Sequence, residues 1–176
     1  WNDVNNRLSV MNISLPASDS SSEGVTFKNG SSFLHTYRVD SGSNQNLFIG
    51  PSAGNFSLTA SGVFENANVG IGPNALRLLT SGYFNTATGA NALEGNTSGI
   101  ENTGVGLQAG RNNRTGSYNV AVGSNALFGV GGLSSSNNTA VGAIALNVAR
   151  GSNNIALGYR AADNLTTGTN NIIIGY

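Results

Sequence analysis

The chain has 176 residues, with 8 Lys and Arg against 8 Asp and Glu, and only 9% of its residues are charged. The length fits roughly one domain, and the lack of a basic excess removes the electrostatic attraction on which binding to nucleic acid or anionic lipid depends. The absence of cysteine excludes a disulfide scaffold and Cys-ligated metal centres, and no apolar run reaches the roughly 18–20 residues of a membrane-spanning helix.

Residues 1–45 form the first predicted region, a strand followed by a β-hairpin. Residues 8–15 alternate as a strand does and end at Pro16. Residues 25–28 and 31–39 flank the pair Asn29-Gly30, which favours the tight type I′ turn of a hairpin. The hairpin carries heavier aromatic residues than the rest of the chain. We expect it to cap the open edge of the repeat domain that follows.

Residues 46–176 form the second predicted region, a repeat domain. An Asn, three mostly apolar or small residues and a Gly recur eight times, and the successive glycines are 22, 17, 17, 17, 19, 16 and 17 residues apart. Most copies continue with an Ala-Leu or Ala-Gly pair and close with Ser-Gly or Thr-Gly. A period this short predicts an all-β solenoid with one coil of two short strands and two turns per repeat. Eight coils about 4.8 Å apart give a rod about 34 Å long.

The first and last residues of the motif have predicted structural roles. The asparagines are expected to stack in register and to hydrogen-bond along the rod through their side-chain amides. They are Asn46, Asn68, Asn85, Asn102, Asn119, Asn138, Asn154 and Asn171. The glycines are expected to turn the corner with a positive φ, where a Cβ would clash. They are Gly50, Gly72, Gly89, Gly106, Gly123, Gly142, Gly158 and Gly175.

The three residues between Asn and Gly alternate between two faces of the predicted strand. The first and third are nearly all β-branched or aliphatic, and we expect them to form the inner wall of the coil. The middle residue is Gly or Ala in six of the eight copies, and we expect it to face outward against another protomer. These candidate oligomer-interface residues are Gly70, Ala87, Gly104, Ala121, Ala140 and Ala156. The alternative interpretation is that the turns leave no room for larger side chains.

No catalytic, cofactor-binding or metal-ligating constellation emerges from the repeats. The carboxylates Glu65, Glu94, Glu101 and Asp163 fall at unrelated repeat positions, so they imply no acid–base pair. The one histidine, His35, is expected to be a packing or surface residue. The arginines in the turns of the C-terminal half are expected to be solvated corners that keep the rod soluble. The alternative is that they contact a glycan or an anionic polymer together with nearby tyrosines, and the corner insertions 55–66 and 128–136 are the places where a solenoid usually carries recognition. The candidate surface-binding residues are Arg111, Arg114, Tyr118, Arg150, Tyr159 and Arg160.

The recurring pattern Asn-Thr-Ala-Val-Gly, followed by Ala-Leu and by Ser-Gly or Thr-Gly, resembles the YadA-like head repeats of trimeric autotransporter adhesins. It resembles still more the related tail fibres of bacteriophages and contractile injection systems, and residues 24–37 are similar to the segment that precedes such repeats. The resemblance covers about residues 24–176. It implies a left-handed parallel β-roll, three chains packed about a threefold axis and an extracellular adhesive or spacer role. The coil of about 17 residues is longer than is usual in those adhesin heads.

The sequence therefore predicts a non-enzymatic, homotrimeric fibre or adhesin segment without cofactors, located at a cell surface, on a virion tail or on an injection-system fibre. Its expected partners are its own copies and a cell-surface glycan or protein receptor, with neither nucleic acid binding nor membrane insertion. One alternative is a purely structural spacer or self-assembling filament subunit without a ligand. Another is a glycan-cleaving β-helix enzyme, which the lack of a carboxylate cluster disfavours. Because the chain stops directly after the eighth repeat, we expect the natural polypeptide to continue beyond Tyr176.

Overall fold

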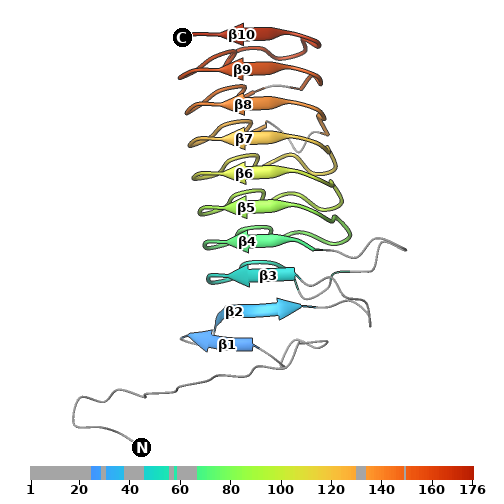
Figure 1. Ribbon diagram of the computed structural model, residues 1–176, viewed down its shortest axis with the longest axis vertical. Helices are drawn as coiled ribbons and strands as arrows, with labels where there is room; N and C mark the ends of the chain where they lie inside the picture. The colour runs from blue at the N-terminus through green and yellow to red at the C-terminus, as the bar shows by residue number, and fades with distance from the viewer. Residues whose placement is uncertain are drawn as a thin grey trace, which may run out of the picture.

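The computed structural model describes residues 25–28, 31–37, 46–55, 58, 67–129, 134–148 and 150–176. These residues form one ten-stranded sheet in which the strands follow one another in chain order (Figure 1). The predicted strand at residues 8–15 and most of the predicted insertion at 55–66 lie outside the described residues, as do residues 130–133 of the second insertion.

Eight short parallel strands form the repeat domain and confirm the predicted β-solenoid. Figure 1 shows them stacked as the rungs of a rod, with the turns of each coil behind them. They are β3 (Asn46–Ile49), β4 (Val69–Ile71), β5 (Thr86–Thr88), β6 (Thr103–Val105), β7 (Val120–Val122), β8 (Thr139–Val141), β9 (Ile155–Leu157) and β10 (Ile172–Ile174). Equivalent motif positions pair in every case, as in Ala87 with Gly104 and Gly104 with Ala121. The coils therefore stay in register although their lengths differ.

The predicted hairpin is present at the first edge of this sheet. β1 (Val25–Lys28) pairs antiparallel with β2 (Ser31–Tyr37), with a register shift between Thr26 and Phe27. β2 then pairs antiparallel with β3, the first strand of the repeat domain. The hairpin thus occupies the free edge of the first coil and continues its hydrogen bonding.

The strand faces are the reverse of the predicted arrangement. The middle residues of the motif point into the coil, and Ala87, Ala140 and Ala156 are completely buried. The first and third residues point outward, so that β5 and β9 show an exposed–buried–exposed pattern. The predictions that the aliphatic residues line the interior and that the small residues form the oligomer contact are both wrong. The corrected residues are Gly70, Ala87, Gly104, Ala121, Ala140 and Ala156, all of them buried within their own chain.

The reason for this reversal is the narrow interior of the coil. A Cβ added at Gly70 would lie 2.8 Å from the ring of Phe48, and one added at Gly104 would lie 2.8 Å from Cγ of Leu93. Beside these side chains, a strand residue facing inward can therefore hardly exceed Ala in size. The alternative interpretation from the sequence, limited space, is the correct one.

The opposite wall of the core comes from the residue pair three and four places after each corner glycine, which is Ala-Leu in four coils. Its alanines are buried throughout, and Leu76, Leu93, Leu127 and Leu146 are at most 2% exposed. These leucines adopt φ values of 46–55°, a left-handed conformation that costs a non-glycine residue about 1–2 kcal/mol. Burying a leucine contributes about 1.5–3 kcal/mol, which offsets that strain.

In the first coil, the large and the small residue have exchanged positions between the strand and the turn. Phe48 occupies the middle strand position and Gly54 replaces the leucine, because a Cβ at Gly54 would lie 2.3 Å from the Phe48 ring. In this coil the large side chain that fills the interior comes from the strand and not from the turn.

Candidate interaction surfaces

The asparagine ladder forms as predicted and fixes the register of the coils. Asn102 shows its geometry. Its Nδ2 donates to Oδ1 of Asn85 at 3.1 Å and to the carbonyl of Gly116 at 2.9 Å. Its Oδ1 accepts from the backbone N–H and from Nδ2 of Asn119, at 3.1 and 2.9 Å. The same side-chain bonds connect all eight asparagines from Asn46 to Asn171.

The corner glycines also behave as predicted. All eight have φ between 126° and 131°, which side-chain-bearing residues rarely adopt. A Cβ at Gly106 would lie 2.8 Å from the backbone carbonyl of Gly123, and the same clash recurs along the stack. Both sets of residues are therefore structural elements, and the ladder asparagines from Asn46 to Asn154 are buried.

A series of positions outside the corner glycines is strained and was not predicted from the sequence. Positive φ values recur at three positions in the described coils. These positions are two places after the corner glycine, four places after it, and directly before the ladder asparagine. Asn74, Asn91 and Asn125 suit the first of these positions because asparagine tolerates the left-handed region. These asparagines, and Asn137, Asn153 and Asn170 before the ladder asparagines, were the available signal. The leucines four places after the corner and the aromatic residues Phe84 and Tyr118 before the ladder asparagines gave none.

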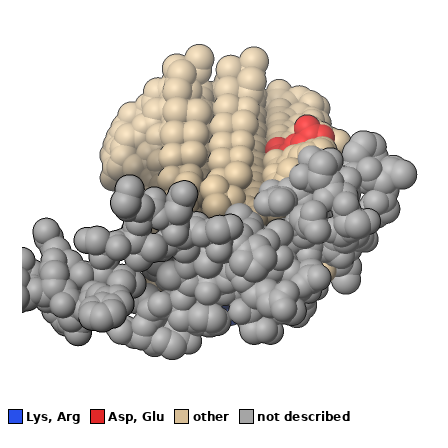
Figure 2. Space-filling model, turned by 60° about the horizontal axis from the view of Figure 1, so that its bottom comes forward, with Lys and Arg blue, Asp and Glu red and all other residues tan. Residues whose placement is uncertain are grey.

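The outward face of the sheet is an uncharged surface. Two columns of Thr, Val, Ile and Leu run along β3–β10, at the first and third motif positions. Val105, Val120, Ile155 and Leu157 are between 36% and 47% exposed. Figure 2 shows such ridges of uncharged residues running in parallel along the described part of the rod, with one small acidic patch at their margin.

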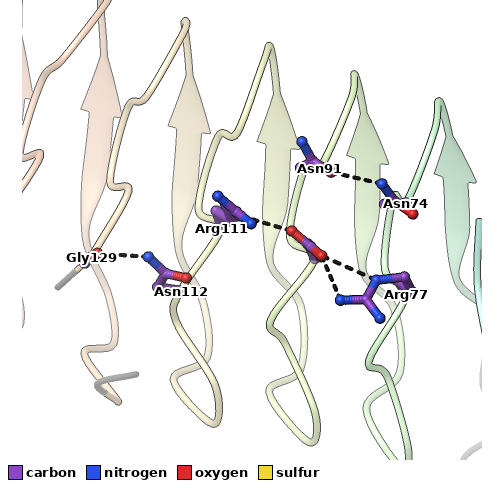
Figure 3. A network of polar contacts seen from close by, with 7 residues as sticks. Asn74, Arg77, Asn91, Arg111, Asn112 and Gly129 are labelled. Carbon is purple, nitrogen blue, oxygen red and sulfur yellow. Dashed lines mark hydrogen bonds and ion pairs between the residues drawn. The ribbon is translucent and has the colours of Figure 1, made fainter. Parts of the chain in front are cut away.

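The turns after the strands carry the polar network drawn in Figure 3. The Glu94 carboxylate lies between two arginines of the neighbouring coils. Its Oε1 accepts from Nε and Nη2 of Arg77, at 3.0 and 2.7 Å, and its Oε2 accepts from Nε of Arg111 at 2.7 Å. Burial raises the pKa of Glu94, but the hydrogen bonds and charges of the two arginines outweigh this and leave the pKa below its ordinary value.

The six candidate surface-binding residues do not form one site. Arg111 belongs to the Glu94 network, and its guanidinium carbon lies 5.9 Å from the centre of the Phe128 ring. Tyr118 is 51% exposed at a different corner, directly before Asn119 of the ladder. Arg114 and Arg150 are exposed and make no ion pair within the described residues.

The last coil brings Tyr159 and Arg160 together. Tyr159 stacks on Tyr176, with ring centres 5.8 Å apart, and Nε of Arg160 donates to Asp163 at 2.7 Å. This ion pair raises the pKa of Arg160. A shallow hollow lies beside it, lined by Arg160, Asp163, Asn164 and Tyr176.

The described part of the chain holds no group of three or more His, Asp or Glu side chains able to bind a metal ion. Within the same residues, no helix has the length and apolar character needed to cross a bilayer. No family model, curated protein or solved structure matches the chain.

Proposed function

We propose that this chain is a non-enzymatic segment of an extracellular fibre or adhesin, and that three copies pack through the outward face of the sheet. The observation that supports this most is the uncharged surface along β3–β10. A rod exposed to water on all sides would gain solubility from charged residues on a flat sheet, whereas this face keeps aliphatic and Thr side chains along its length.

The interface would use the first and third motif positions in place of the middle one. Val105, Val122 and their equivalents lie on ridges with the spacing of the coils, so identical rods can interdigitate without disturbing their interiors. Burial of exposed aliphatic area contributes about 25 cal/mol per Å², and a repeated ridge multiplies that gain along the rod. The hairpin β1–β2 would cap the first coil in each copy.

The second candidate is a spacer without a ligand. The dispersal of Arg114, Tyr118, Arg150 and Arg160 over separate corners favours it, because a receptor site needs convergent groups. The two candidates share the trimeric rod and differ only in whether its side surfaces bind anything.

The assembly is tested by light scattering after size exclusion over a range of concentrations. We expect three times 17.9 kDa, stable on dilution. Val122→Lys should lower the mass because it places a charge on the outward ridge. Ser98→Lys, an exposed turn residue, is the matched control and should leave the trimer intact. A wild-type chain that stays monomeric at all concentrations would refute the proposed assembly.

A further inference from the structure

Arg111 is held in one orientation while four of the five N–H donors that a guanidinium has stay unused within the described residues. Its Nε donates to Glu94, and the Phe128 ring lies against the guanidinium from the following coil. Within the described residues, Nη1 and Nη2 have no hydrogen-bond partner, although the side chain is only 34% exposed. The outer edge of the guanidinium is therefore fixed in place and open.

The charges of the network are unbalanced. One carboxylate, with 9% of its side chain exposed, faces two arginines, so the group carries a net positive charge. Arg77 alone already holds Oε1 of Glu94 with two hydrogen bonds. A second arginine adds a cation that the chain does not neutralise within the described residues.

Two asparagine side chains, Asn91 and Asn112, lie in the turns that carry this network (Figure 3). The Asn91 Oδ1 accepts from Nδ2 of Asn74 at 3.0 Å, and in Figure 3 its own amide nitrogen points away from that bond. Nδ2 of Asn112, next to Arg111 in the chain, donates to the Gly129 carbonyl at 3.0 Å, which leaves its Oδ1 as an acceptor. Amide donors and acceptors of this kind suit sugar hydroxyl groups.

We propose that Arg111, together with Asn91 and Asn112, binds a carboxylate-bearing polysaccharide such as a polyuronate. The Nη1–Nη2 edge of a guanidinium matches a carboxylate in a bidentate pair, and Glu94 and Phe128 reduce the entropy lost when that pair forms. The turns that carry this site are separate from the outward sheet face, so trimer formation leaves it accessible. The inference rests on the proposed extracellular fibre and names its ligand class.

The charge of the whole chain favours a glycan over nucleic acid. Eight positive and eight negative residues provide no extended basic field, which binding to a dense phosphate backbone requires. A single oriented guanidinium fits the widely spaced carboxylates of a uronic acid polymer, with hydroxyl groups between them.

The experiment is a calorimetric titration of the full chain with an oligogalacturonate. A neutral maltooligosaccharide of equal length and single-stranded DNA serve as comparison ligands. Arg111→Gln should weaken oligogalacturonate binding at least about tenfold, the effect of losing one charge-assisted bidentate pair. Arg160→Gln removes an arginine of the last coil that is paired with Asp163, and it should bind like the wild type.

Arg111→Lys keeps the charge but removes the bidentate edge, so it should bind oligogalacturonate more weakly than the wild type. This variant tests the proposal independently if Arg111→Gln does not fold. Absence of oligogalacturonate binding by the wild type, equal losses in the Arg111 and Arg160 variants, or equal affinity for DNA would overturn the proposal. Light scattering separates this outcome from a failure of the proposed assembly, because Arg111→Gln should remain trimeric.

Discussion

Replacement of Asn102 by alanine tests how much the buried ladder stabilises the rod. The substitution removes four side-chain hydrogen bonds at a position that is 1% exposed. Asn119 keeps bonds from its Nδ2 to the carbonyls of Ser117 and Ser135, and Asn85 Oδ1 still accepts from the backbone of residue 102. The backbone N–H of Asn119 and the carbonyl of Gly116 lose their partners.

Each orphaned buried group costs about 1–3 kcal/mol, so Asn102→Ala should lower the free energy of unfolding by about 2–6 kcal/mol. Asn112→Ala makes the same chemical change at a half-buried position whose side chain donates one hydrogen bond, to the Gly129 carbonyl, and it should cost about 0.5–1.5 kcal/mol. Urea unfolding followed by circular dichroism, at one fixed protomer concentration, measures both. Equal stability losses in the two variants would refute the assignment of the ladder as a major stabilising element.

Three further predictions concern the interior, the corners and the Glu94 network. Ala140→Leu should destabilise the fold by about 1–3 kcal/mol through overpacking of the interior. Val141→Leu, on the outward face, should change stability by less than about 0.5 kcal/mol. The reverse order in urea unfolding would contradict the observed strand faces. Gly123→Ala should lower the free energy of unfolding by more than about 2 kcal/mol, because φ is 128° and the new Cβ would lie 2.7 Å from the Gly142 carbonyl carbon. Thermal unfolding measures this loss, and the control Ser124→Ala should match the wild type to within about 1 kcal/mol. Because the two arginines hold the folded-state pKa of Glu94 below its ordinary value, Glu94 contributes stability that is present above the unfolded pKa and lost as the pH falls through the folded pKa. Melting temperatures measured from about pH 6 to about pH 3 should therefore drop less for Glu94→Gln than for the wild type, and parallel curves would exclude this role.

The sequence by itself determined the repeat architecture. A fixed spacing of Asn and Gly is compatible with few folds. A buried side-chain amide must find hydrogen-bond partners in the neighbouring coils, and a corner with φ near 128° admits almost only glycine. The hairpin was equally visible in the Asn29-Gly30 pair between two alternating segments. Both features depend on local chemistry repeated along the chain.

Only the tertiary structure decided which strand face is inside. Alternation groups Val120 with Val122 and separates both from Ala121, but it does not say which group faces the core. The usual rule places the larger aliphatic residues inside, and it fails here because Leu93, Leu127 and their equivalents already fill the interior from the opposite wall. The space left opposite them admits only Gly or Ala, so the β-branched residues face outward. The Arg77–Glu94–Arg111 network likewise exists only because residues 17 apart become neighbours when the coils stack.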